Sequence, residues 1–246
     1  NLGSSPSTRT MKTFAISDIH GCYDELMALY NQLPIDPEKD RIVFLWDYID
    51  RWSKTKQVIE QLIRWKKQYP HWQFLYGNHE DLMLDTLMYQ GRIYNSFDLW
   101  WQQGGKETFL SYVPEEATRY EKSIMQVKDV IPKEHLEWLA ALPRWFADEQ
   151  YIFVHGGLQP GKTPEETDPY EMIWIRDQFI DSHYDWEKKV IFGHTADGRG
   201  EYYNPANPWG RQQRLMPIVK QNKIGIDTAV CPPSNFRLTC LELPTE

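Results

Sequence analysis

The stretch TFAISDIHG, residues 13–21, joins a short apolar run to two side chains that can bind a metal ion. Thr13–Ser17 has the length and composition of a buried strand. Asp18 and His20 follow directly, and because they lie two positions apart on extended chain, their side chains point the same way. The stretch therefore predicts a strand that ends in two candidate ligands for one ion.

Four more apolar runs end in the same way. They occupy residues 41–46, 73–76, 151–154 and 189–192, and they lead into Asp47, into Asn78 and His79, into His155, and into His194. Two further runs, residues 223–226 and 236–241, complete the set of predicted strands. Because ligands bind in the crevice at the carboxyl ends of the strands of an open α/β sheet, we expect these polar side chains to converge.

Longer amphipathic stretches separate the apolar runs. Apolar residues at helical spacing predict helices near residues 26–33, 58–63 and 82–89, the first of them ended by Pro34 and Pro37. Short strands that alternate with helices predict an α/β fold.

Residues 11–246 are expected to form a single domain. Residues 1–10 are small and polar and are interpreted as a tag or a disordered extension. Residues 91–142 are rich in aromatic and charged side chains without strand alternation, which predicts a helical cap insertion. Residues 196–213, with several glycines and prolines, predict a long loop, and such loops are often functional.

Composition limits the partners of this chain. A formal net charge of −8 over 246 residues disfavours binding to nucleic acid or to an anionic membrane surface. Cys22, Cys231 and Cys240 form no CxxC pair, which argues against a disulfide framework or a cysteine zinc site and favours a reducing cytoplasmic location. Because the chain is acidic overall, a phosphorylated partner must be held by a local cluster of positive charge.

The donor set at the strand ends suits two metal ions. Its members are carboxylate, amide and imidazole groups, namely Asp18, Asp47, Asn78, His20, His155 and His194. This mixture suits manganese, iron or zinc, and it is too large for one catalytic ion. We expect two divalent ions, with Mn²⁺ as the first candidate and Fe or Zn as alternatives. Such a pair can activate water for phosphate-ester hydrolysis. The guanidinium groups of Arg51 and Arg176 could bind the phosphate oxygens.

Five short motifs in order resemble those of the calcineurin-like metallophosphoesterases, and among them the bacterial and phage phosphoprotein phosphatases. They are SDIHG at 17–21, DYIDR at 47–51, GNHE at 77–80, HGG at 155–157 and GHT at 193–195. The resemblance extends from about residue 13 to residue 241. It implies a β-sandwich flanked by helices, in α-β-β-α layers.

The resemblance also implies roles for single residues. One metal would be held by Asp18, His20 and Asp47, and the other by Asp47, Asn78, His155 and His194, with Asp47 bridging the two. His79 would protonate the leaving alkoxide and Asp50 would orient it, while Arg51, Arg176 and Asn78 would bind the phosphate. Gln103–Gly105 resembles the NGG turn of the family, with glutamine in place of asparagine.

Three functions are compatible with this resemblance. The first is a serine/threonine protein phosphatase, with phosphotyrosine or a small phosphate ester as further substrates, in which a metal-activated hydroxide attacks phosphorus directly. The second is symmetrical hydrolysis of diadenosine tetraphosphate by a sister family, which usually carries alanine at the position of Asp50 and aspartate at that of Glu80. The third is a weakened or inactive phosphoprotein-binding variant.

The third function rests on Trp46 and Trp52. These tryptophans occupy positions where the family motif GDxxDRG has glycine. An indole at either position must swing away or intrude on the metals and the phosphate, because only glycine allows a close approach at little cost. We expect metal binding through Asp47 to survive, the loop 47–53 to be displaced and turnover to be weakened, so that restoring both glycines raises kcat/KM.

Other residues are expected to have structural roles. His71, His135 and His183 lack a strand-end setting, and Glu80 is interpreted as a first-turn acid of the following helix. Asp227 is expected to hold a nearby backbone group or histidine. The tryptophans expected in core and cap packing are Trp100, Trp101, Trp138 and Trp145.

Overall fold

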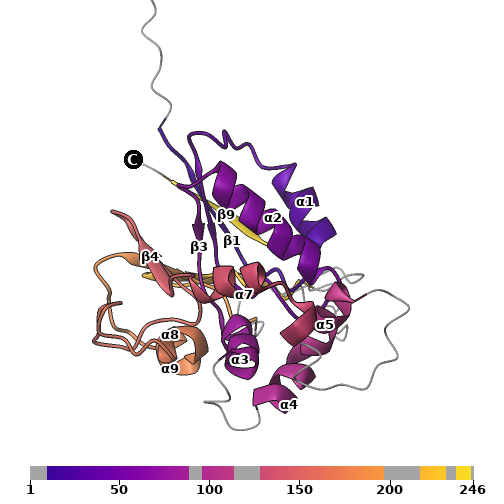
Figure 1. The fold of residues 1–246 in the computed structure, drawn as a ribbon. Helices are drawn as coiled ribbons and strands as arrows, with labels where there is room; N and C mark the ends of the chain where they lie inside the picture. The colour runs from indigo at the N-terminus through magenta and orange to yellow at the C-terminus, as the bar shows by residue number, and fades with distance from the viewer. Residues whose placement is uncertain (1–9, 89–95, 114–127, 197–216, 231–236, 245–246) are drawn as a thin grey trace, which may run out of the picture.

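The computed structural model describes residues 10–88, 96–113, 128–196, 217–230 and 237–244. Within these ranges two β-sheets pack face to face, and helices cover the outer face of each sheet (Figure 1). This arrangement confirms the predicted α/β sandwich of the metallophosphoesterase type.

The first sheet has the order β3-β2-β1-β9. Its strands are β1 (Thr13–Ile16), β2 (Arg41–Phe44), β3 (Gln73–Phe74) and β9 (Cys240–Leu243). β1, β2 and β3 run parallel, whereas β9 pairs with β1 in the antiparallel sense. The carboxyl ends of three neighbouring strands therefore open at one edge of the sheet.

The second sheet has the order β4-β5-β6-β8-β7. Its strands are β4 (Trp145–Ala147), β5 (Tyr151–Val154), β6 (Lys189–Phe192), β8 (Lys223–Gly225) and β7 (Ile218–Val219). The three central strands β5, β6 and β8 are parallel, and the two outer strands are antiparallel to their neighbours.

Alternation along the strands builds two apolar layers. Ala15 and Val43 point into the layer between the sheets, where they meet Phe153 and Ile191 of the second sheet. Their neighbours along β1 and β2, such as Phe44, point outward to the helices.

Helices on both outer faces complete the layers. α1 (Tyr23–Tyr30) and α2 (Thr55–Gln68) lie against the first sheet, where Trp65 of α2 stacks on Phe44 with ring centroids 5.7 Å apart (Figure 1). α3 (Asn78–Leu87), α8 (Glu171–Trp174) and α9 (Asp177–Ile180) lie on the other side of the molecule. Phe179 of α9 contacts Phe192 of β6, with centroids 5.1 Å apart.

The described part of the predicted cap insertion is helical. It contains α4 (Ser96–Trp100), the π-helical turn η1 (Trp101–Gly105), α5 (Lys106–Tyr112) and α7 (Lys133–Ala140). α4 packs beside α3, and α5 packs beside α2. These helices therefore lie next to the loops that follow β2 and β3.

The structure differs from the sequence predictions at several boundaries. β4 and β7 were not predicted, because three-residue and two-residue edge strands are too short to show a clear alternation. The last strand lies at Cys240–Leu243 and not at 236–241, since its register is set by pairing with β1. α3 begins at Asn78, before the predicted start at residue 82.

Two predicted segments lie outside the described residues, namely the extension at 1–10, except for residue 10, and the loop at 196–213, except for residue 196. In the part of the chain that is described, no helix combines the length and the apolar character that a membrane crossing requires.

Candidate metal centre and active site

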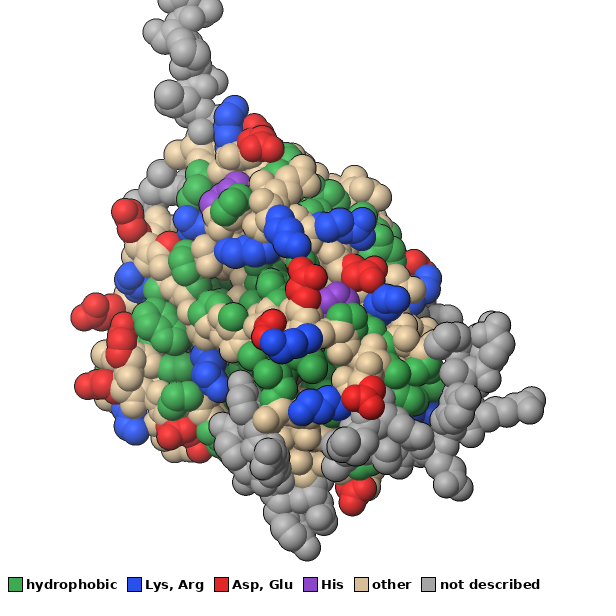
Figure 2. Space-filling model, in the orientation of Figure 1, with side chains coloured by type: hydrophobic (Ala, Val, Ile, Leu, Met, Phe, Trp, Pro, Cys, Tyr) green, Lys and Arg blue, Asp and Glu red, His purple; other side chains and the backbone are tan. Residues whose placement is uncertain are grey.

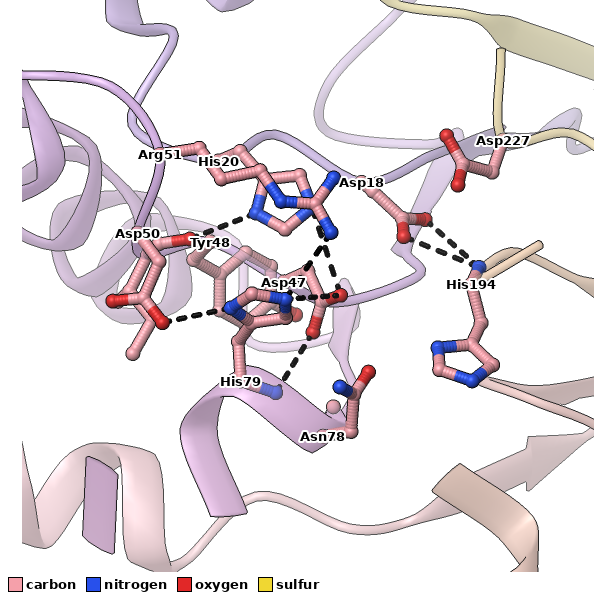
Figure 3. Close-up of polar contacts among 12 residues, drawn as sticks. Asp18, His20, Asp47, Tyr48, Asp50, Arg51, Asn78, His79, His194 and Asp227 are labelled. Carbon is pink, nitrogen blue, oxygen red and sulfur yellow. Dashed lines mark hydrogen bonds and ion pairs between the residues drawn. The ribbon is translucent and has the colours of Figure 1, made fainter. Parts of the chain in front are cut away.

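The carboxyl ends of the parallel strands of both sheets meet at one place. The loop after β1 carries Asp18 and His20, the loop after β2 carries Asp47, Asp50 and Arg51, and the start of α3 carries Asn78 and His79 (Figure 3). The second sheet contributes His155 after β5, His194 after β6 and Asp227 after β8. Except for Arg51, these side chains belong to buried residues. The predicted convergence is thus a feature of the fold.

Asp47 lies at the middle of the cluster. Its Oδ2 atom is 3.5 Å from Nε2 of His155, 3.7 Å from Nε2 of His20 and 4.0 Å from Nε2 of His79. Its Oδ1 atom accepts a hydrogen bond from the backbone N–H of His79 at 3.2 Å. Burial raises the pKa of Asp47 to about 7, because removal from water disfavours the charged form of the carboxylate.

Two groups of donor atoms share Asp47. One consists of His20, Asp47 and His79, the other of Asp47, His155 and His194, and within each group the ligand atoms lie within 4.8 Å of one another. Asn78 adjoins the second group, with its Oδ1 atom 2.6 Å from Nε2 of His155. A shared carboxylate between two nitrogen-rich groups fits a pair of divalent ions.

The histidines are prepared to bind metal. Nδ1 of His20 faces the carbonyl of Ile49 at 2.9 Å, which directs the proton to Nδ1 and leaves the lone pair on Nε2. Nε2 of His20 and Nε2 of His194 are buried and have no hydrogen-bond partner. Burial lowers the pKa of His20, His155 and His194, so these imidazoles are neutral, which is the form that binds metal. Buried acceptors without partners are the observation that fits the residues to metal ions.

Asp18 is near the centre but belongs to neither group. Its carboxylate accepts a hydrogen bond from the backbone N–H of His194, 3.1 Å from Oδ2. A Cβ atom at Gly193 would lie 2.3 Å from Oδ1 of Asp18, so glycine is needed for this contact. Burial and the neighbouring charges of Asp227 and Asp47 raise the pKa of Asp18. The first group therefore contains His79 where the resemblance implies Asp18.

His79 and Asp50 form a close pair. Nδ1 of His79 is 2.7 Å from Oδ2 of Asp50. Oδ1 of Asp50 accepts hydrogen bonds from the indole N–H of Trp100 at 3.0 Å and from the hydroxyl of Thr108 at 2.7 Å. Burial raises the pKa of Asp50 to about 8 and lowers that of His79 to about 4.

Trp100 and Thr108 are functional neighbours that the sequence analysis did not identify. They come from α4 and α5, 50 and 58 positions after Asp50, and no local pattern connects them to it. Trp100 was interpreted as packing only, and it is indeed fully buried, but it also fixes the carboxylate that faces His79.

Both predicted arginines face the centre. The guanidinium of Arg51 lies 3.3 Å from Nε2 of His79, and Figure 3 shows it extending over His79 and Asp47. Arg176 donates from one nitrogen to the carbonyl of His194 at 2.7 Å and to the hydroxyl of Thr195 at 3.0 Å. On the face shown in Figure 2, basic and acidic side chains are interspersed. The positive charge for a phosphate is therefore local, as the acidic composition requires.

The loop after β2 has a strained backbone. Trp46, Asp47, Asp50 and Arg51 have φ values of 91°, 44°, 70° and 67°, in the left-handed region that disfavours such side chains. Gly104 supports this loop, because a Cβ atom there would lie 2.3 Å from the Arg51 nitrogen. Strain of this kind is usual at functional sites that the surrounding structure holds in place.

The two tryptophans pack in different parts of the core. Trp46 is fully buried in the layer between the sheets, and its ring contacts the edge of His155 with centroids 4.9 Å apart. Trp52 is half-buried against the outer core. The indole of Trp46 thus packs between the sheets and against a donor histidine, and Asp47 lies among the histidines next to it.

Glu80 and Asp227 hold backbone groups. Oε1 of Glu80 accepts from the N–H of Tyr48 at 2.9 Å and Oε2 from that of Gly77 at 3.1 Å, so this acid both begins α3 and ties it to the loop after β2. Asp227 accepts from the N–H of Ala229 at 2.8 Å, as expected, and lies beside Asp18 (Figure 3).

The histidines predicted to be structural lie elsewhere. His71 contacts the carbonyl of Asp40 at 3.0 Å, and Nδ1 of His135 is 2.9 Å from the hydroxyl of Tyr112. His183 is exposed after α9. Trp145 belongs to β4 and therefore to the second sheet.

Curated proteins with similar sequences include symmetrical bis(5'-nucleosyl)-tetraphosphatases. Those of Methylobacillus flagellatus and Dechloromonas aromatica are 28% and 29% identical to the chain over 159 and 150 residues. The alignments cover 63% and 61% of this chain but only 47% and 45% of the relatives. The chain thus spans about half the length of the curated relatives it matches.

Solved structures with the same fold include two phosphatases. A TM-score of 0.61 at 17% identity relates the chain to a protein provisionally assigned as a diadenosine tetraphosphatase, over 96% of this chain and 91% of that one. A TM-score of 0.51 at 16% identity relates it to a Saccharomyces cerevisiae serine/threonine phosphatase similar to human phosphatase PP5, over 90% and 68%. At these identities the likeness concerns the fold alone.

The profile of one family matches most of the chain. Residues 11–226 match the calcineurin-like phosphoesterases. This range begins just before β1 and contains every donor residue described above. The chain therefore belongs to the calcineurin-like phosphoesterase family.

Proposed function

We propose that this chain hydrolyses phosphate esters at a site for two divalent metal ions. The observation that carries the proposal is the pair of donor groups that share Asp47 and expose uncommitted histidine nitrogens to the same space. Asp47, His155, His194 and Asn78 would hold one ion, and Asp18, His20 and Asp47 the other, which leaves Nε2 of His79 free of metal. When bound, such ions activate water and neutralise phosphate charge. Mn²⁺ is the first metal to test, followed by Fe and Zn.

The arginines would bind and orient the phosphate. Arg51 follows β2 of the first sheet, and Arg176 lies between α8 and α9, after β5 of the second sheet. Both face the same centre, so their guanidinium groups can contact different oxygens of one phosphate. The bonds of Arg176 to His194 and Thr195 restrict its side chain before substrate arrives. This restriction lowers the entropy cost of binding.

His79 would move the proton. It lies beside Arg51, with its Nε2 atom toward the centre and its Nδ1 atom on Asp50. Asp50 holds the ring through Nδ1, so that Nε2 faces the position where a leaving oxygen would receive a proton. Such a donor typically accelerates a reaction by about 10²–10⁴-fold.

Symmetrical hydrolysis of a dinucleoside tetraphosphate is the best-supported substrate assignment. Its support is the name that the curated relatives share, together with a fold match that covers most of both chains. The sequence analysis had placed the protein phosphatase first, and the relatives favour the alternative.

Protein phosphatase activity is retained as a second candidate because of Asp50. The sister family that cleaves diadenosine tetraphosphate usually carries alanine at this position, whereas here Asp50 holds His79 at 2.7 Å. Phosphoserine, phosphothreonine and phosphotyrosine peptides are therefore the competing substrates.

Hydrolysis of diadenosine tetraphosphate by the Mn²⁺-loaded chain tests the proposal. We expect ADP as the sole nucleotide product, loss of activity with a chelator, and two metal ions per chain by elemental analysis. His155→Ala should lower the metal content, whereas the matched variant His135→Ala, outside the site, should not. A chain that binds no divalent ion and hydrolyses neither this substrate nor p-nitrophenyl phosphate would refute the proposed function.

A further inference from the structure

Two stacked aromatic residues extend from the metal centre to the surface. Trp174, the last residue of α8, packs edge-on against His194, with ring centroids 6.0 Å apart at an interplanar angle of 89°. Tyr170 stacks on Trp174, with centroids 5.8 Å apart at an angle of 28°. We call Tyr170 and Trp174 the aromatic pair.

The pair results from local helix geometry. Its two residues are four positions apart on one helical turn, so their side chains lie on the same face. Asp168 fixes the start of this turn by accepting a hydrogen bond from the backbone N–H of Tyr170 at 2.8 Å. The rings are thus held in place by the backbone that carries them.

One ring of the aromatic pair is half-buried and the other is exposed. Trp174 is half-buried, whereas Tyr170 is 51% exposed, which is unusual for an aromatic side chain packed so near buried metal-capable residues. The negative charge of Asp81, in the first turn of α3, contributes to raising the pKa of Tyr170 after partial burial. Tyr170 therefore lies on the rim, within reach of the electrostatic field of α3.

The same segment binds phosphate under the proposed function. Arg176 follows Trp174 by two residues, and its guanidinium is held on His194 and Thr195. Arg176 and Trp174 both contact His194, so a phosphate bound by Arg176 would lie near the inner end of the aromatic pair. Phosphate-binding cation and aromatic faces lie side by side, as in sites that bind nucleotides.

We propose that the aromatic pair is a nucleobase subsite, in which Tyr170 stacks on the base of a nucleotide whose phosphates lie at the metal centre. This inference rests on the proposed function and deepens it by naming the part of the substrate that the rim recognises. A phosphotyrosine ring is joined to its phosphate through one oxygen, so it stays nearer to the phosphate than the base of a nucleoside diphosphate does. A nucleoside diphosphate places its base beyond a second phosphate and a ribose, which matches the outer position of Tyr170.

Binding of ADP and pyrophosphate tests the subsite, because the two probes share the diphosphate and differ by the nucleoside. Calorimetry on metal-free and Mn²⁺-loaded protein should give ADP an affinity about tenfold or more above that of pyrophosphate, the range of one base–aromatic stack. Tyr170→Ala should remove most of this difference, and Tyr170→Phe should retain it. Saturation transfer from the protein to the adenine protons should follow the same order.

Tyr184→Ala is the matched control. Tyr184 is 43% exposed and packs against Trp186 with centroids 5.0 Å apart, so it is another surface tyrosine on a tryptophan, after α9. Its loss should leave ADP affinity unchanged. Equal affinities of wild-type protein for ADP and pyrophosphate, or equal effects of Tyr170→Ala and Tyr184→Ala, would overturn the inference.

Kinetics separate the inference from the proposed function. If the wild-type chain cleaves diadenosine tetraphosphate and Tyr170→Ala changes neither kcat/KM nor ADP affinity, the subsite is wrong and the function stands. If the wild-type chain cleaves neither diadenosine tetraphosphate nor p-nitrophenyl phosphate but its preference for ADP depends on Tyr170, the proposed function is wrong and the subsite stands. If Tyr170→Ala affects only a phosphotyrosine peptide, the pair accepts an aryl phosphate and the inference is refuted.

Discussion

Replacing Trp46 by glycine should destabilise this protein by much less than replacing another fully buried tryptophan. Trp46 is 0% exposed and has φ = 91°, a conformation that glycine adopts freely and tryptophan does not. Its indole N–H is buried without a partner. Trp72 is the matched comparison, because it is also 0% exposed, is absent from the set with positive φ, and donates to the carbonyl of Asp40 at 3.0 Å.

Both substitutions lose the stability that a buried tryptophan provides, but only Trp46→Gly also relieves backbone strain. Removing a buried tryptophan costs about 3–5 kcal/mol, and the added freedom of glycine in the unfolded chain costs about 0.5–1 kcal/mol more. At Trp46, relief of backbone strain returns about 1–3 kcal/mol. At Trp72 there is no strain to relieve, and a hydrogen bond worth about 1 kcal/mol is lost. We therefore expect a loss of about 0.5–5 kcal/mol for Trp46→Gly and about 4.5–7 kcal/mol for Trp72→Gly.

Urea unfolding of the metal-free variants, followed by circular dichroism, measures both values. A loss for Trp46→Gly equal to that for Trp72→Gly would show that the backbone at Trp46 is not strained and would refute the reasoning. The double variant Trp46→Gly/Trp52→Gly, assayed with metal, tests the sequence-based prediction that restoring both glycines raises kcat/KM. That prediction concerns turnover, which stability measurements do not address.

Three further outcomes are expected. Asp50→Asn should lower kcat on phosphoserine peptides by up to about 10²–10⁴-fold and much less on p-nitrophenyl phosphate, whose leaving group needs no proton; equal losses on both would contradict proton donation by His79. Gly104→Ala should raise KM, because its Cβ atom would lie 2.3 Å from the backbone nitrogen of Arg51 and would displace that residue; an unchanged KM would argue that Gly104 does not support Arg51. Burial raises the pKa of Asp47 and Glu80 to about 7 and that of Asp50 to about 8, so the native state binds more protons than the unfolded state near neutral pH. Metal-free protein should therefore lose on the order of 1–3 kcal/mol of stability between about pH 6.5 and 8, and a stability that rises over this range would contradict it.

The strand-end pattern was the most informative feature of the sequence. Each of the five apolar runs that precede a donor residue is a strand in the structure, and Asp47, His155 and His194 meet as the pattern predicts. This success has a simple cause, since parallel strands open at one edge and carry whatever follows them to the same place.

Side-chain detail at the centre was less accessible. Asp18 stays a predicted ligand, and its carboxylate also accepts a hydrogen bond from the backbone of His194, a contact that depends on Gly193 far along the chain and that no local pattern indicates. The partners of Asp50 on α4 and α5 have no signature of their own in the sequence. Short edge strands such as β4 form because a neighbour supplies their hydrogen bonds, and local composition does not reveal that neighbour.

The amino-acid sequence by itself determined the alternation of strands and helices, the candidate donor residues and their order along the chain, because hydrophobic periodicity and residue chemistry are local properties. Only the tertiary structure decided that Asp47 is the shared member of two donor groups, that the Trp46 indole packs between the sheets, and that Trp174, on which Tyr170 stacks, packs against His194. These are distances between residues remote in sequence, and they are fixed by the packing of two sheets against each other.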